Sequence, residues 1–553
     1  MKKFSRNLQL GVLSIASISL TSCFDDVVYL DQNWNEDNQL RTLSYSTSQG
    51  SQLIPYNWYL NLVDAKTKHP LNSSIVIESL GYLPDYNPNS TSNPDQLPVG
   101  FVKDTDPVTG DWIGINCAAC HTGQVVVDDV AIRIDGAPGM GDYIGLMRTT
   151  KASIDYTLNN KRAFKKFSKA LKEQDTDTLK LNLQAASEEI AGIIYRDGSE
   201  LHKGGFGRVD AATAIRNEIF VHDLGVMDNY LTPSAPVSYP ALWDTPQYEK
   251  VQYPGYAENP FGRNAGQVLG VMGRLDLKNP ESFLQSSIRR DNLFYLENWL
   301  TQLQPPKWPE QYLGKINLES AERGAVLYAQ QDQNGYSCIS CHALKDENGQ
   351  YPLTPAEQNA FGKQFIKTPL TPILIVQTDP NVLLNLYDPR PIQTAQLAPL
   401  FGGAQEVSFT TALVTLTKYT VGTLYNAETA LSQLEQAAYS GFRFYAPGNS
   451  AAPLFSGYLT RPLAGVWATS PYLHNGSVPN LYELLLPADQ RSDVFFVGNQ
   501  QFDTKNVGYQ KDEWIRAFEF DTNVSGNSNA GHEFSTHLND DQRYDLIEFL
   551  KTL

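Results

Sequence analysis

Two short clusters of cysteine and histidine are the residues of this 553-residue sequence with the clearest capacity for chemistry. The first reads Cys117-Ala-Ala-Cys120-His121, and the second reads Cys338-Ile-Ser-Cys341-His342. Two residues between the cysteines put both sulfurs on one helical turn, where the thiols can add to the two vinyl groups of a haem. The histidine that follows is then directed at the iron. The spacing therefore predicts two covalently bound haem c groups. The predicted haem-binding residues are Cys117, Cys120, His121, Cys338, Cys341 and His342.

Two other uses of paired cysteines fit this sequence less well. A Cys₄ zinc site would place its two pairs about 15–20 residues apart, whereas these pairs lie in opposite halves of the chain and each is followed by a histidine. A thioredoxin-like redox pair would need a strand–helix–strand context, and neither flank offers one. We therefore favour haem attachment.

The fifth cysteine, Cys23, closes an N-terminal segment that is typical of exported proteins. Lys2, Lys3 and Arg6 precede the apolar run 8–20, which is too short for a transmembrane helix and fits a signal peptide. The run ends Leu-Thr-Ser-Cys23, which resembles the lipobox of bacterial lipoproteins. The resemblance implies cleavage before Cys23 and acylation of its thiol; the alternative is a plain signal peptide with an incidental cysteine.

These N-terminal features predict a lipid-anchored protein of the periplasm or cell surface. Phe24, rather than Asp, follows the cysteine, which in enteric-type bacteria favours the outer membrane. No later segment has 18 consecutive apolar residues, so we expect the rest of the chain to be soluble.

The overall composition excludes several other classes of protein. Hydrophobic residues at 41% and charged residues at 19% are typical of a folded globular chain. A net charge of −17 without a Lys/Arg-rich run argues against a nucleic-acid partner. Five cysteines in a chain of this length are too few for a disulfide-stabilised scaffold.

The elements around the second motif are those of a small c-type cytochrome. Residues 318–329 have helical periodicity and carry Gly324, where another helix could pack closely. Asn539 and Asp540 can cap a final helix. In cytochrome c the first and last helices cross beside the haem, and we expect the same here. The apolar face of the final helix comprises Leu546, Phe549, Leu550 and Leu553.

We therefore predict a mainly α fold with two cytochrome c-type haem domains, long irregular insertions and an N-terminal extension. Two helical stretches are expected within 151–196, and irregular structure within 230–261. The two C-x-x-C-H units are the only internal repeat that we identify. The predicted divisions are a signal peptide 1–23, an extension 24–100, a first haem domain 101–310 and a second haem domain 311–553.

The two predicted haems differ in the residues available as the second axial ligand of the iron. No methionine follows Met272, so the second haem is expected to take a histidine from its own domain: His474, His532 or His537. No comparable partner stands out for the first haem, because His202 and His222 fit surface or core positions. We expect an open or labile position there, where small molecules can bind.

A family resemblance adds to these inferences. Residues 461–481 contain Thr-Ser-Pro-Tyr-Leu-His474-Asn-Gly-Ser, which closely resembles a signature of bacterial di-haem cytochrome c peroxidases. This version, together with Gly526-Asn-Ser-Asn-Ala-Gly-His532-Glu-Phe, is nearest to the larger branch that includes the rubber oxygenases. The second haem of that branch has two histidine ligands, which implies His532 as the sixth ligand, with His474 as its rival and His537 as a solvated loop residue.

The same resemblance implies roles for several other residues. An aromatic residue between the haems often relays electrons in this family, and Trp243 and Tyr253 are candidates; the alternative is that both are packing residues. The peroxidases use a distal carboxylate, for which Glu258 is the only candidate in 258–267. Thr469 and Pro471 match positions whose carbonyls bind an interdomain calcium ion.

The resemblance implies an oxidoreductase that reduces hydrogen peroxide at the first haem with electrons relayed through the second. Its expected partners are a small redox protein as electron donor and the membrane, through Cys23. One alternative is a dioxygenase of the rubber-oxygenase type, which would use O₂. Another is a periplasmic electron carrier without enzymatic activity.

Overall fold

A computed structural model describes residues 27–34, 39–85, 91–198, 205–258, 260–358, 362–425, 456–514 and 516–553. The predicted signal peptide, Cys23 and His202 lie outside these ranges. Within them, no helix is both long enough and apolar enough to cross a bilayer.

The prediction of a mainly α fold is wrong, because the chain is a mixed α/β protein with about 39% helix and 14% strand. Much of the strand content surrounds the first cysteine motif. β5 (Thr122–Val127) and β6 (Val130–Asp135) form a hairpin, with Val127 opposite Val130. Asp128 and Asp129 in its turn have φ of 47° and 66°, the left-handed values of a tight two-residue turn. The alternating β-branched residues of this segment favour strands locally, and helical periodicity is absent.

Two small sheets enclose the first motif. β1 (Val27–Tyr29) runs parallel to β6, so the start of the described chain joins the β5–β6 hairpin. The second sheet has the order β2-β4-β3. Its strands are β2 (Ile54–Pro55), β3 (Phe101–Asp106) and β4 (Gly110–Ile115).

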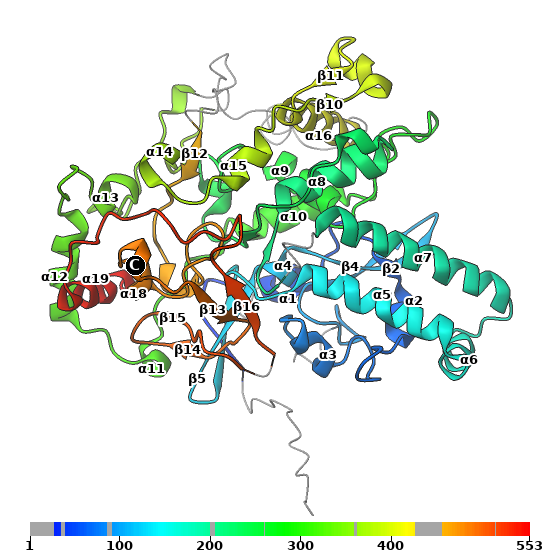
Figure 1. The fold of residues 1–553 in the computed structure, drawn as a ribbon, viewed down its shortest axis with the longest axis horizontal. Coiled ribbons are helices and arrows are strands. Elements are labelled where there is room, and N and C mark those ends of the chain that lie inside the picture. The colour runs from blue at the N-terminus through cyan, green and yellow to red at the C-terminus, as the bar shows by residue number, and fades with distance from the viewer. Residues whose placement is uncertain are drawn as a thin grey trace, which may run out of the picture.

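Three helices occupy 143–197, where two helical stretches were expected. Each begins at a side-chain cap: Asp142, Asn160 and Asp175 accept hydrogen bonds from backbone N–H groups of the first turn. They lie at one end of the molecule, and the helices that surround the second motif lie at the other (Figure 1). The three helices are α5 (Tyr143–Asn159), α6 (Lys161–Ala170) and α7 (Thr176–Asp197).

The helix pair predicted around the second motif is confirmed. α12 (Leu318–Ala329) and α19 (Asp540–Lys551) pack against each other, and Asn539 forms a capping box with Gln542 at the start of α19. A Cβ atom at Gly324 would lie 2.1 Å from the carbonyl oxygen of Asp545, so only glycine permits this approach.

Apart from α9, α10 and α16, the remaining helices and strands are short. The segment 230–261 is largely irregular, as predicted. The other helices are α1 (Leu40–Ser46), α2 (Tyr56–Asn61), α3 (Ser74–Ser79), α4 (Cys117–Cys120), α8 (Ala211–Arg216), α9 (Pro260–Gly270), α10 (Arg290–Leu300), α11 (Glu310–Leu313), α13 (Cys338–Cys341), α14 (Ile373–Val376), α15 (Asn381–Leu386), α16 (Phe409–Tyr425), α18 (Leu481–Leu484) and the π-helical turn η1 (Asn217–Asp223). The other strands are β7 (Arg208–Val209), β8 (Val237–Ser238), β9 (Leu370–Pro372), β10 (Ile392–Gln393), β11 (Glu406–Val407), β12 (Gly457–Leu459), β13 (Val494–Val497), β14 (Phe502–Asp503), β15 (Gly508–Tyr509) and β16 (Phe518–Asp521).

One apolar core contains residues from both halves of the chain. It includes Ile132 of β6, Trp243, Trp467 and Leu546 of α19, and Cys338 of the second motif packs against it. Gly465 approaches Trp243 so closely that a Cβ atom would lie 3.0 Å from the indole. The halves that carry the two motifs therefore pack directly against each other.

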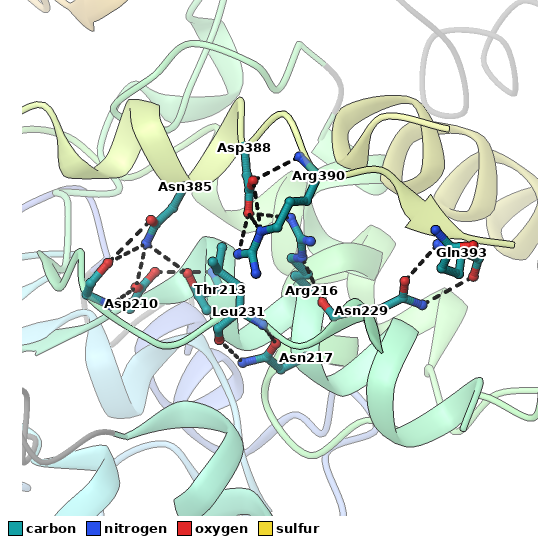
Figure 2. Close-up of polar contacts among 11 residues, drawn as sticks. Asp210, Thr213, Arg216, Asn217, Asn229, Leu231, Asn385, Asp388, Arg390 and Gln393 are labelled. Carbon is teal, nitrogen blue, oxygen red and sulfur yellow. Dashed lines mark hydrogen bonds and ion pairs between the residues drawn. The ribbon is translucent and has the colours of Figure 1, made fainter. Parts of the chain in front are cut away.

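A buried polar network also joins segments from the two halves (Figure 2). Arg216, at the end of α8, donates to the carbonyl of Asn229 at 3.0 Å and pairs with Asp388 at 3.4 Å. Asn385 of α15 donates to Asp210 at 3.2 Å. Such buried groups are stable only when they are paired, so the network fixes segment 381–393 against α8.

Candidate functional site

The first cysteine motif forms a single helical turn, α4, whose position is fixed from both sides. The Asn116 side chain accepts from the N–H of Ala118 and donates to the carbonyl of Ser44 at 2.7 Å. His121 directly follows the turn, and its Nδ1 lies 2.7 Å from the carbonyl oxygen of Pro240. Because a carbonyl can only accept, Nδ1 carries the proton, and Nε2 is left as the ligating nitrogen.

The second motif repeats this arrangement. α13 is also a single turn, closed by a capping box between Ser337 and Ser340. Nδ1 of His342 lies 2.8 Å from the carbonyl oxygen of Arg461. The orientation and tautomer of both imidazoles are thus set by a backbone carbonyl, as is common for metal-bound histidines.

Sequence reasoning missed these two carbonyl partners. Pro240 lies 119 residues after His121, and Arg461 lies 119 residues after His342. The equal separation is a signal that the sequence contains, and a proline and a tryptophan stand at or shortly after each partner: Pro240 with Trp243, and Pro462 with Trp467. Each C-x-x-C-H unit is therefore followed at the same distance by the residue that orients its histidine.

The two motifs fit haem c by the chemistry of their donors. All four cysteines are free thiols. Burial lowers the pKa of His121 to about 4 and also lowers the pKa of His342, so both imidazoles are neutral, the form that binds a metal. Each motif borders a cavity, of 70 Å³ beside Cys117 and His121 and of 260 Å³ beside Cys338, Cys341 and His342.

Three histidines were candidates for the sixth ligand of the second haem, and of these His532 lies opposite His342. Their ring centroids are 6.3 Å apart, close to the separation of about 6 Å expected when nitrogens bind one metal from opposite sides at about 2.0–2.1 Å. His474 is buried and stacks on Tyr458 with 4.1 Å between centroids. His537 is exposed on a loop. The assignment of His532 as the ligand stays a prediction, and the position of its ring relative to His342 is suited to that role.

The loop that carries His532 is held by two buried side chains. Asn475, next to His474 in the Leu-His-Asn-Gly-Ser segment, donates to the carbonyls of Gly526 at 3.1 Å and Ser528 at 3.0 Å. Arg491 donates to the carbonyl of Gly531 at 2.9 Å. The Leu-His-Asn-Gly-Ser segment thus supports the loop through Asn475, while its His474 lines the same cavity as His342 and His532.

The cavity beside His121 contains a different set of groups. Arg263, Asn264 and Gln267 of α9 line it, and its described lining residues include no second histidine and no methionine. Glu297 of α10 is buried, pairs with Arg263 and accepts from the Asn264 amide at 2.6 Å. Sequence reasoning offered Glu258 as the carboxylate of this region; Glu258 does not line the cavity, and Glu297 lies on a separate helix that spacing could not link to α9.

The two predicted relay aromatics have different surroundings. Tyr253 lines both cavities, and its hydroxyl lies 3.0 Å from Oγ of Ser238. Trp243 lines the larger cavity and donates to the carbonyl of Ala464 at 2.9 Å. Thr469 and Pro471, the predicted calcium-binding positions, also line the larger cavity.

Comparison with known proteins supports a cytochrome. Residues 457–496 match a family model described as RoxA-like, cytochrome c-like. Uncharacterized protein y4iJ of Sinorhizobium fredii (strain NBRC 101917 / NGR234) is 31% identical over 585 residues, which cover 96% of this chain and 94% of that protein. Uncharacterized protein y4iM of the same organism is 37% identical over 122 residues, which cover 18% of this chain and 28% of that protein.

The matched segment supports a cytochrome c protein related to the RoxA-like family, and the match implies a haem-containing oxidoreductase with haem c. Within that class, the chain belongs to the family of y4iJ, with which it aligns over nearly its whole length.

Proposed function

We propose that this protein is a di-haem c-type cytochrome of the peroxidase superfamily, which reduces hydrogen peroxide at the haem held by Cys117, Cys120 and His121. Electrons reach that haem through a second haem, held by the motif 338–342. The observation that carries the proposal is the cavity beside His121, where Arg263, Asn264 and Gln267 converge without a second strong iron ligand among the described lining residues.

When bound, the first haem supplies one-electron chemistry and an iron position at which peroxide can bind. Around that position the chain supplies charge and hydrogen bonds. The guanidinium of Arg263 can stabilise negative charge that develops as the O–O bond breaks, and the amides of Asn264 and Gln267 can orient the peroxide. Glu297 acts as a positioning residue, because it holds the side chains of Arg263 and Asn264 without itself lining the cavity.

The second site is suited to electron transfer. His342 and His532 face each other across the larger cavity and would both ligate the iron of a haem held there. A haem iron with two protein ligands would exchange electrons without binding substrate. We include His532 in the proposal as the sixth ligand.

A dioxygenase is the second candidate function, and the RoxA-like match favours it. The matched segment 457–496 lines the larger cavity and holds the His532 loop. The RoxA-like match therefore bears more on the second site than on the cavity beside His121. The polar groups of α9 favour a small polar substrate over an apolar organic one. A pure electron carrier would need a sixth ligand at the first haem.

The proposal extends to the location and partners of the protein. A lipid on Cys23 would anchor it to the outer membrane, in the periplasm or at the cell surface. A small redox protein would supply electrons, and nucleic acid has no part in the activity. Calcium bound through the carbonyls of Thr469 and Pro471 remains a prediction.

The test uses the purified full-length holoprotein. A pyridine haemochrome assay should find two haems per chain, and reduced cytochrome c should be oxidised when peroxide is added. Arg263→Leu should slow peroxide turnover by about 10²-fold or more, as loss of a preorganised donor does. Arg323→Leu, at an exposed position on α12, is the matched control and should leave turnover unchanged.

Three outcomes would reject the proposal. Consumption of O₂ without peroxide turnover would favour the dioxygenase. Failure of CO to bind either reduced haem would favour the electron carrier. Equal turnover in Arg263→Leu and Arg323→Leu would remove α9 from the site.

A further inference from the structure

Arg461 belongs to both cysteine–histidine sites at once. Its backbone carbonyl accepts the Nδ1–H of His342 at 2.8 Å. Its guanidinium Nη1 donates to the carbonyl of Ala241 at 3.1 Å. The residue lines the larger cavity and also the cavity beside His121.

Ala241 completes a connection to the first histidine. It directly follows Pro240, whose carbonyl accepts the Nδ1–H of His121 at 2.7 Å. Three hydrogen bonds and the covalent bonds of Arg461 and of the Pro240–Ala241 peptide therefore join the two imidazoles without a gap.

We propose that Arg461 is the positioning residue that carries electron exchange between the two sites, by way of this hydrogen-bonded path from His342 to His121. The proposal rests on the proposed function, which requires two haems and electron flow from the second to the first. With both haems bound, each transfer would oxidise the iron ligated by His342 by one electron and reduce the iron ligated by His121 by one electron. No proton or bond is exchanged, and the small redox protein proposed above supplies the next electron.

The main competing path runs through Tyr253, which also lines both cavities. Its hydroxyl is bonded to Ser238, and its ring meets the edge of the His474 ring at 6.0 Å. Neither contact reaches His121 or His342, so this path includes through-space steps. Electrons tunnel more readily along covalent and hydrogen bonds than across such gaps, which favours Arg461.

Arginine is suited to the role because its rigid fork offers five donors and holds a fixed orientation. The segment around it is also fixed, since Leu459 pairs with Leu370 in the β9–β12 ladder. The side chain can thus reach Ala241 while its own carbonyl stays on His342.

The test compares Arg461→Met, Arg461→Lys and Arg461→Gln with Tyr253→Phe in the holoprotein. A pyridine haemochrome assay first establishes that both haems are present in each variant, and the low-spin EPR signal establishes that the second haem keeps its ligands; the absence of two haems from the wild type would reject the proposed function instead. Flash photoreduction then delivers one electron to the second haem, and transient absorbance follows its arrival at the first. Redox titration of both haems corrects each rate for driving force.

Arg461→Met should slow the corrected transfer rate by about tenfold or more. Arg461→Gln, which retains a donor without the charge, and Arg461→Lys, which retains both, should each recover part of the rate. Arg390→Met removes an exposed arginine and is the control; its corrected transfer rate should equal that of the wild type. A corrected rate in Arg461→Met equal to that of the wild type, or slowing confined to Tyr253→Phe, would overturn the proposal.

Discussion

His342 and His532 face each other across the larger cavity, with 6.3 Å between their ring centroids. Neither ring holds the other in place. His342 is oriented by the carbonyl of Arg461. His532 is positioned by its loop, whose backbone carbonyls accept hydrogen bonds from Asn475 and Arg491. The separation that suits a metal between the rings is therefore set by two independent anchors.

Replacement of His532 should change the spin state of the second haem. His532→Ala removes the proposed sixth ligand, so the low-spin EPR signal of that haem should be replaced by a high-spin signal. His474→Ala is the matched control and should retain the low-spin signal, because His474 stacks on Tyr458. The reverse pattern would reassign the ligand to His474.

Asn475 should be sensitive even to an isosteric change. Asn475→Asp replaces two N–H donors with a carboxylate against the carbonyls of Gly526 and Ser528, in a position with no exposed surface. We expect the free energy of unfolding to fall by about 3 kcal/mol, measured by urea denaturation. Asn348→Asp, at an exposed position, should change it by less than about 0.5 kcal/mol. Equal losses in the two variants would show that the loop contact is unimportant.

The buried pair of Arg216 and Asp388 should contribute to stability (Figure 2). Burial lowers the pKa of Arg216. Because the guanidinium is buried, water cannot take the place of the Asp388 carboxylate if that partner is lost. Asp388→Asn should therefore lower the free energy of unfolding by about 3 kcal/mol. Arg390 also contacts Asp388 but is 58% exposed, so Arg390→Gln should cost no more than about 1 kcal/mol. A larger loss in Arg390→Gln would contradict this ranking.

His222 should make stability depend on pH. Hydrogen bonds to Asp223, Glu189 and Glu218 raise its pKa from 6.5 to about 11. A raised pKa stabilises the folded state fully below pH 6.5, and the contribution disappears as the pH rises toward 11. The difference in unfolding free energy between wild type and His222→Gln should thus be largest near pH 6 and shrink by pH 10. A difference that grows with pH would contradict the assignment of a charged imidazole.

Several local features could be predicted because neighbouring residues determine them. The periodicity of 318–329 predicts α12, and the cap at Asn539 predicts the start of α19, since both depend on contacts within a few residues; α19 ends at Lys551, before the predicted Leu553. The predicted fold class was wrong, although the β-branched residues of 122–135 are a local signal for strands: Val125–Val127 form a run, and Val130, Ile132 and Ile134 alternate.

The sequence by itself determined which residues could hold haem, since C-x-x-C-H spacing acts within one helical turn. Only the tertiary structure decided what surrounds each histidine. Pro240 and Arg461 orient the two imidazoles across 119 residues each, Glu297 reaches Arg263 from another helix, and His532 comes to lie opposite His342. These relationships depend on how distant segments pack, and residue spacing along a chain carries little information about such contacts.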